Sequence, residues 1–120
     1  MSQFVEGPTR TFRAAAALGQ FLRVKLSSGK VAVAGVGATD EPAELGTMEI
    51  AAVEADELVS VRLRNAPGTV KMVASGPITQ GAAVYGAAAG KISATTSGAS
   101  VGRALEEAAA DGDVIEVLRF

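Results

Sequence analysis

The chain contains no cysteine, no histidine and no tryptophan, and it has only one tyrosine and four phenylalanines. Without cysteine it can form neither disulfides nor thiolate metal sites, and it has no thiol nucleophile. Without histidine it lacks the side chain that most often acts as a general acid or base and as a ligand of transition metals. Most catalytic templates lose their central residue here. We therefore expect a protein that is not an enzyme and that uses no cofactor and no metal ion.

Long apolar runs and a strong net charge are also missing. No stretch approaches the roughly 20 apolar residues that a membrane helix requires, and the first residues lack the basic and apolar regions of a secretory signal. The net charge is −2, from 11 basic and 13 acidic residues, which gives no field strong enough to attract nucleic acid or an anionic membrane. We expect a soluble, unexported protein with neither nucleic acid nor membrane as a partner.

Bulky side chains are scarce. The length of 120 residues suits a single domain, and 48% of the residues are hydrophobic, but alanine is the commonest residue and there are 14 glycines. A chain of this size buries roughly two-thirds of its unfolded surface. Because many of its apolar side chains are small, this burial gives a core of low volume. We therefore expect subunit contacts to add stability, and we predict a homo-oligomer.

The sequence repeats itself. A Gly-Lys step followed by an aliphatic residue occurs at residues 29–31 and again at 90–92, and residues 46–61 align with residues 102–117 without a gap. Gly19 and Gly81 enter the two copies. Because one repeat usually cannot bury its apolar face alone, this pattern predicts a mainly β fold, a small β-barrel or β-sandwich. It would be built from two similar strand units, about residues 19–64 and 81–118, with each copy covering the other.

Alternating side chains predict the strands. Residues 21–26 place three aliphatic side chains on one face and Arg23 and Lys25 on the other, as a half-buried strand does. A turn is expected at residues 27–30, a strand at residues 31–34 and a polar loop at residues 35–42. Residues 14–18 are interpreted as a link or as the lead-in to a strand. Further strands are expected at residues 47–53, 58–64, 69–73, 83–85, 91–95 and 114–118.

Residues 103–110 give conflicting signals. Their helix propensity and the stop that follows at Asp111-Gly112 favour a helix. The repeat places them opposite residues 47–54, which alternate as a strand does. The prediction is a strand, with a helix as the alternative.

Glycine-rich and acidic segments do not form convincing sites. Residues 34–38 and 86–91 resemble phosphate loops, but a phosphate loop needs Lys followed by Ser or Thr at the start of a helix, so we interpret both as turns. The carboxylates near residues 40–44, 54–57, 106–107 and 111–113 could act as acid and base or bind calcium, but residues 111–113 lack the remaining ligands of a calcium loop, and we interpret all four groups as solvated loop and turn charges. The basic residues are spread over several strands without the one-sided cluster that nucleic-acid binding needs.

Residues 1–13 precede the repeat, and we expect them to form an extended N-terminal arm before a single β domain at residues 14–120. Pro8 disfavours helical geometry at Gly7. A frayed end or a simple edge strand is the alternative. Phe4 and Phe12 are two of only four phenylalanines in the chain, which favours a role in contact with another molecule.

Taken in order, these segments resemble the small capsid cement or head-decoration proteins of tailed bacteriophages, over nearly the whole chain. The residues that carry the resemblance are Phe4-Val5-Glu6-Gly7-x-Thr9-x-Thr11, the alanine-rich step into Gly19, Ile78-x-x-Gly81-x-x-Val84-Tyr85 with Gly90-Lys91-Ile92, and Val101-Gly102-Arg103-Ala104 with Gly112-Asp113-Val114-Ile115-Glu116-Val117. The long first loop, residues 35–44, and the segment 62–64 depart from the family's pattern.

The resemblance implies a β-rich structural virion protein that is made in the host cytoplasm and binds the outer surface of an expanded capsid. There it would stabilise the shell, with the major capsid protein as its partner, usually as a homotrimer and in some phages as a dimer. It also implies that the arm lies on neighbouring capsid subunits. We expect the following arm residues to bind the capsid: Phe4, Val5, Glu6, Arg10, Phe12 and Arg13.

Two other classes of function stay open. One is a small-ligand or carbohydrate-binding β-domain, which would need a pocket lined by aromatic and polar groups; a single tyrosine and no tryptophan argue against a sugar platform. The other is an oligomerisation module of a larger assembly.

Overall fold

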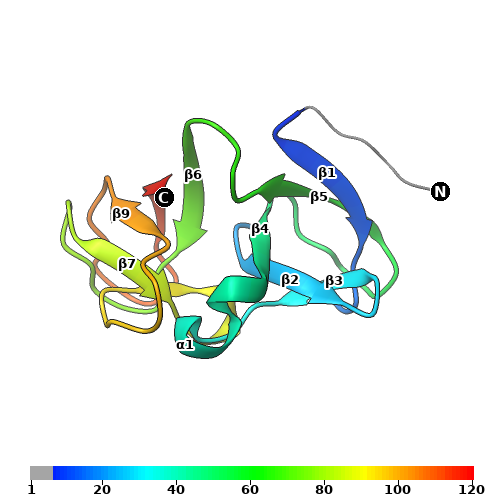
Figure 1. Ribbon diagram of the computed structural model, residues 1–120, viewed down its shortest axis with the longest axis horizontal. Coiled ribbons are helices and arrows are strands. Elements are labelled where there is room, and N and C mark those ends of the chain that lie inside the picture. The colour runs from blue at the N-terminus through cyan, green and yellow to red at the C-terminus, as the bar shows by residue number, and fades with distance from the viewer. Residues whose placement is uncertain (1–6) are drawn as a thin grey trace.

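A computed structural model describes residues 7–120, and it consists of two five-stranded antiparallel sheets side by side (Figure 1). The first half contains β1 (Thr9–Arg13), β2 (Arg23–Ser27), β3 (Lys30–Val33), β4 (Glu44–Met48) and β5 (Leu58–Leu63). The second half contains β6 (Thr69–Val73), β7 (Ala83–Gly86), β8 (Ile92–Ser93), β9 (Gly102–Ala104) and β10 (Val114–Arg119). The mainly β fold predicted from the repeat is confirmed.

The two halves have the same topology. The strand order is β1-β5-β4-β2-β3 in the first sheet and β6-β10-β9-β7-β8 in the second, so each strand has a counterpart five strands later. Met48 pairs with Val61, and Ala104 pairs with Val117. The ungapped alignment of residues 46–61 with 102–117 is therefore also an alignment in space.

The repeat is wider than the sequence indicated, because β1 and β6 are its first strands. Its entry point also differs from the prediction. Gln20 and Gln80 each donate a side-chain hydrogen bond of 3.0 Å to a backbone oxygen, and each is followed by a residue of positive φ, Phe21 (+66°) and Gly81 (+89°). The counterpart of Gly81 is therefore Phe21 and not Gly19.

Each half closes around its own core. The sheets curl so that their outer strands meet, through a bridge between Ala14 and Val31 in the first half and between Ala74 and Ile92 in the second. The first core contains Phe12, Ala14, Leu18, Val24, Val31, Met48, Ala52, Val59 and Val61. The second contains Met72, Ala74, Ile78, Val84, Ile92, Val101, Ala104, Ala108, Ile115 and Val117. The expectation that one copy covers the other is wrong, because a curled five-stranded sheet covers itself.

Some local predictions need correction: the strand expected at residues 47–53 is β4, which ends at Met48, and the one expected at residues 91–95 is the short β8. The segment 103–110 is neither a helix nor a long strand: β9 ends at Ala104, and the chain then bends until Ala108 bridges Ile78. Its counterpart also bends after β4, and there Ala52 bridges Leu18. These bridges fix the bends and explain why propensity does not decide the structure.

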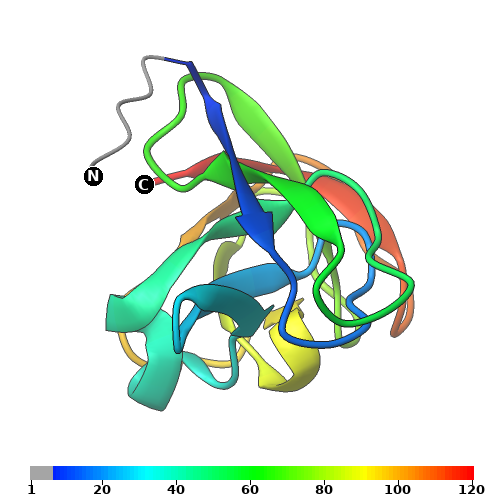
Figure 2. The same ribbon diagram turned by 90° about the vertical axis from the view of Figure 1, so that its right-hand side faces the viewer.

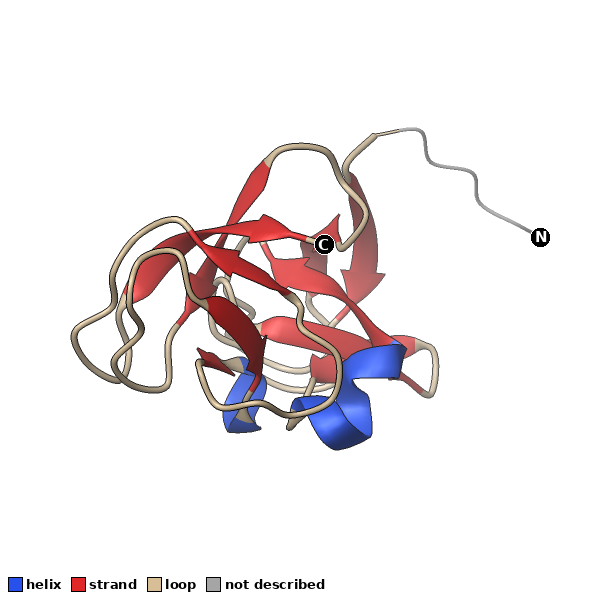
Figure 3. Cartoon of the chain, turned by 60° about the vertical axis from the view of Figure 1, so that its left-hand side comes forward, coloured by secondary structure: helices blue, strands red, loops and turns tan. Residues whose placement is uncertain are grey.

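The expected polar loop at residues 35–42 contains a short helix, α1 (Gly37–Asp40), followed by the 3₁₀ turn η1 (Glu41–Ala43). Figure 3 shows these segments at the same end of the molecule as the other 3₁₀ turn, η2 (Ala88–Gly90). Gly37 lies so close to the backbone oxygen of Ser97 that a Cβ at this position would collide with it. The glycine thus lets α1 of the first half pack against a loop of the second.

The repeated Gly-Lys step is a turn in both copies, as predicted. Gly29 has a φ of +79° and Gly90 a φ of +76°. The lysine that follows forms an ion pair with the loop before the closing strand of its half, Lys30 with Asp56 and Lys91 with Asp111. The motif therefore joins two loops of one half.

Candidate binding surfaces

The residues predicted to bind a capsid fall into two groups. Phe4, Val5 and Glu6 lie outside the described residues. The others belong to β1, which pairs with β5 from Thr9 opposite Arg62 to Arg13 opposite Leu58. Phe12 is 9% exposed and belongs to the first core. The last part of the expected arm is therefore a strand of the body.

Both arginines of β1 contact other groups of the first half. The Arg10 guanidinium lies 4.6 Å from the centroid of the Phe12 ring. Arg13 is exposed, and its Nη1 donates a hydrogen bond of 2.9 Å to the backbone oxygen of Asp56. Thr11 is exposed as well. Thr11 and Arg13 are thus the β1 side chains that a partner reaches most easily.

One edge of β1 is open to an additional strand at Thr9 and Thr11, while its end at Arg13 meets β3 through the bridge between Ala14 and Val31. Ala14 donates a backbone hydrogen bond of 2.9 Å to the oxygen of Glu57. Because hydrogen-bonded and non-hydrogen-bonded positions alternate in an antiparallel pair, the backbone groups of Thr9, Thr11 and Arg13 point away from β5. Figure 2 shows β1 in front, on the side of the first half that faces away from the second half. Such an edge can pair with a segment of another chain.

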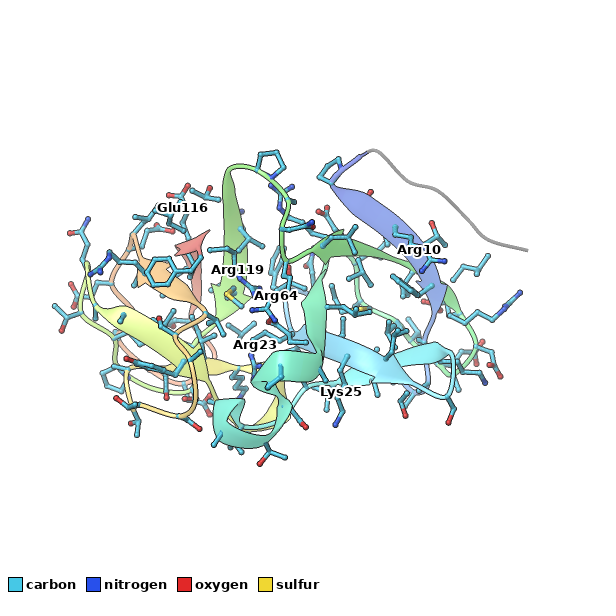
Figure 4. All side chains as sticks on the ribbon, viewed as in Figure 1. Arg10, Arg23, Lys25, Arg64, Glu116 and Arg119 are labelled. Atoms are coloured by element: carbon cyan, nitrogen blue, oxygen red, sulfur yellow. The ribbon has the colours of Figure 1, made fainter. Side chains whose placement is uncertain are left out.

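A buried arginine joins the two halves. Arg23 was predicted on an open face but is fully buried, because the second half covers that face of β2; Figure 4 shows it between the two halves. Its Nη2 donates hydrogen bonds to the backbone oxygens of Gly35 (2.6 Å) and Ala87 (2.7 Å), and its Nε donates to that of Lys91 (3.1 Å). The guanidinium rests on Gly86, where a Cβ would lie 2.7 Å from Nη1. One side chain therefore binds carbonyls of both halves.

A buried ion pair lies at the same junction as Arg23. The Glu44 side chain has no exposed surface and forms an ion pair with Arg119, which is 6% exposed. Burial lowers the pKa of Arg23 from its ordinary value, and the nearby Glu44 carboxylate partly opposes this effect. Glu44 belongs to β4 of the first half and Arg119 to β10 of the second, so this ion pair also joins the two halves.

An open cleft of about 360 Å³ lies between β4 and β5 of the first half and β6 of the second. Its lining residues are Gln20, Phe21, Thr47, Met48, Glu49, Arg62, Thr69, Val70 and Lys71. The Lys71 Nζ lies 5.8 Å from the centroid of the Phe21 ring. Sequence reasoning missed the cleft because both halves contribute to it. The available signal was a phenylalanine at the position where the other copy has glycine.

The two copies differ in their exposed apolar residues. Ile50 is 57% exposed and Val53 is 80% exposed, whereas the aligned residues of the second half are Glu106 and Ala109. The loops are otherwise built alike, since the backbone N–H groups of Val53 and Ala109 both bond to a carboxylate four residues later. The exposed pair Ile50 and Val53 therefore has no apolar counterpart of similar size at the aligned positions of the second copy.

Within residues 7–120, no cluster of three or more histidine, cysteine, aspartate or glutamate side chains is placed to hold a metal ion. In the same part of the chain, no helix has the length and apolar character needed to cross a membrane.

The fold is thus a duplicated, mainly β structure with two cores and a charged junction. It is similar to the N base of the head fiber gp8.5 of bacteriophage phi29, known from a crystal structure, with a TM-score of 0.73 and 17% sequence identity. The similarity covers 93% of this chain and 92% of that chain. No protein-family model matches the chain, and neither does any curated protein. At this identity the likeness concerns the fold.

Proposed function

We propose that the protein is a structural component of a bacteriophage virion. The observation that carries this proposal is the similarity of fold to a phage head-fiber base over nearly the full length of both chains. The sequence motifs favour the same class independently, because they resemble capsid cement and decoration proteins of tailed phages. The proposal is that fold and role have been kept together while the sequences diverged.

In more detail, we propose that the protein binds the major capsid protein on the outer surface of the shell and stabilises it. A capsid offers many identical sites, so an oligomeric subunit gains avidity from several weak contacts at once. We propose a homotrimer, with a dimer as the alternative. Analytical ultracentrifugation distinguishes these assemblies by mass, because one subunit weighs 12.0 kDa.

The proposed contact surface consists of residues 1–8 and the open edge of β1. The exposed Thr11 and Arg13 carry the side-chain contacts in this proposal, while the open backbone groups of β1 can pair with an extended capsid segment. Phe12 supports the strand from the core side. This division explains how one short segment can both belong to the body and face a partner.

The test is to mix the purified protein with capsids that lack decoration and to measure cosedimentation, with cryo-electron microscopy of the pellet. We expect saturable binding, density on the outer surface, and a higher temperature of capsid rupture. Absence of cosedimentation, or density only at the tail or inside the shell, contradicts the proposal.

The contact surface is tested with two changes that spare the fold. Deletion of residues 1–6 is preferred to deletion of residues 1–13, because the longer deletion removes β1 and exposes the first core. Arg13→Glu is compared with Arg103→Glu, since Arg103 is also exposed on a strand and also donates to a backbone oxygen. We expect Arg13→Glu to weaken binding about tenfold, near 1.4 kcal/mol, and Arg103→Glu to bind as the unaltered protein does. Equal binding by the two variants rules out the β1 surface.

A further inference from the structure

Phe21 occupies a backbone conformation that phenylalanine rarely adopts. Its φ is +66°, in the left-handed region where a Cβ crowds the following carbonyl oxygen. At the aligned position the second half has Gly81, with a φ of +89°, which forms the same turn without that strain. Bulky residues at such angles tend to mark functional positions. The first copy thus keeps an aromatic ring where its own repeat shows that glycine suffices.

The ring lies in the cleft, and an unpaired strand edge forms the opposite wall. Ala74 donates a backbone hydrogen bond of 2.8 Å to Asp113, so the alternation of an antiparallel pair points the backbone groups of Thr69 and Lys71 away from β10. Both residues line the cleft. Figure 1 shows the loop that leads from β5 to β6, with the two strands on either side of it. The cleft therefore offers main-chain donors and acceptors on one side and an aromatic ring on the other.

The charges that line the cleft favour an acidic occupant. Arg62 and Lys71 line it together with one carboxylate, Glu49. Arg62 is held in place by a hydrogen bond of 2.6 Å from its Nη2 to the oxygen of Pro67. The Glu116 carboxylate lies beside the lining and accepts a hydrogen bond of 2.6 Å from the hydroxyl of Thr69. The lining itself therefore has one more positive than negative side chain, and Arg62, on the β5 side, is the cation farther from Glu116 in the strand order.

We propose that this cleft binds an extended segment of a partner protein that carries a carboxylate side chain. The segment adds to the open edge of β6 as a strand, which is a common mode of peptide recognition. Alternate residues of a strand share one face, so an apolar side chain contacts Phe21 while a carboxylate two positions away reaches Arg62 or Lys71. The β6 residues that line the cleft, Thr69 to Lys71, offer an edge of about 10 Å at roughly 3.4 Å per residue. This site is separate from the β1 surface and does not depend on its role.

The test is a titration of the full chain, followed by amide chemical shifts, with the peptide acetyl-Val-Thr-Glu-Thr-Val-amide, in which Glu shares one strand face with both valines. A second peptide has Lys in place of Glu. We expect shifts concentrated at residues 69–73 and around Phe21, with a dissociation constant of about 1 mM and at least about fivefold weaker binding of the lysine peptide. Shifts that are absent at several times this concentration, that spread equally over β1, or that are the same for both peptides overturn the proposal.

Three variants give the test a structural control. Phe21→Gly installs the residue that the second copy uses, so the turn is kept while the ring is lost, and we expect at least about fivefold weaker binding. Lys71→Glu should reverse the preference, so that the lysine peptide binds better. Val53→Ser changes an exposed residue that does not line the cleft and should bind the acidic peptide as the unaltered chain does. Unchanged binding by both cleft variants overturns the proposal.

Other occupants give distinguishable results. If the cleft shifts change with protein concentration in the absence of peptide, the occupant is a second copy of the chain. If deletion of residues 1–6 moves the cleft resonances, the occupant is the N-terminal segment of the chain itself. Either result overturns the assignment to a partner protein.

Discussion

Replacement of Arg23 by alanine should loosen the junction between the two halves. The side chain is fully buried and donates to the oxygens of Gly35 in its own half and of Ala87 and Lys91 in the other. Alanine removes all of these bonds at once. It also leaves the partly buried oxygens of Gly35 and Ala87 without this donor and opens a cavity at the junction, whereas the oxygen of Lys91 still accepts from the Ala87 N–H.

The expected loss of stability follows from the type of interaction. Hydrogen bonds that involve a charged group contribute about 1.5–3 kcal/mol each, and this gain is partly offset by the desolvation that lowers the pKa of Arg23. Removal of one partner from a buried charged network typically costs about 3–5 kcal/mol. Against a total stability of roughly 5–15 kcal/mol, this lowers the melting temperature by roughly 10–20 °C.

The chain offers two spectroscopic signals that separate the halves. Tyr85 is the single tyrosine, there is no tryptophan, and Tyr85 lies in β7, so tyrosine fluorescence follows the second half. Far-ultraviolet circular dichroism follows the strands of both halves. In urea we expect the two signals to coincide for the unaltered protein. In Arg23→Ala they should separate, because each half has its own core.

The matched control is Arg103→Ala, which also removes a guanidinium that donates to a backbone oxygen, but from an exposed position. Its free energy of unfolding should change by no more than about 0.5 kcal/mol. If Arg23→Ala loses less than about 1 kcal/mol and its two transitions still coincide, the junction does not depend on this side chain and the reasoning is wrong.

Further predictions concern the glycines and the carboxylates. Gly46→Ala should lower the free energy of unfolding by about 3 kcal/mol or more, because its Cβ would collide with the backbone oxygen of Arg62; Gly76→Ala, with no atom within 4 Å, should leave it unchanged in the same urea titration. The backbone N–H of Gly35 and the Lys25 ammonium lower the pKa of Asp40, and Lys30 lowers that of Asp56. The stability from these carboxylates is present above their unfolded pKa of about 3.9 and is lost as the pH falls through the lowered folded values. Asp40→Asn should flatten the acid side of a stability curve measured from neutral pH downward, and an unchanged acid limb contradicts the assignment.

The internal repeat allowed the mainly β fold to be predicted, because the order of residues along the two copies is the same. Residues 46–61 and 102–117 align in the sequence, and their strands pair in the same way. The prediction failed where a contact comes from the other half. Alternation put Arg23 and Val24 on opposite faces, which is correct, but it could not show that the second half covers the face of Arg23.

The candidate binding surface was predictable only in part. The composition of residues 1–13 drew attention to the N-terminus, but it could not distinguish a free arm from a strand whose Phe12 packs in the first core. The cleft escaped prediction because Phe21 and Lys71 are far apart in the sequence and meet only when the halves pack. A strained residue such as Phe21 has no signature in the sequence apart from its mismatch with Gly81.

The separate pairing of the two sheets sets an order of events during protein synthesis. Every strand pair of the first sheet joins residues between 9 and 63, and every pair of the second joins residues between 69 and 119. The first half can therefore close as it leaves the ribosome, while the strands of the second are still inside the exit tunnel. Arg23 then holds only the carbonyls of its own half, and it gains those of Ala87 and Lys91 when the later half arrives. The last step of folding is then the packing of the second half against the first, around the Arg23 guanidinium.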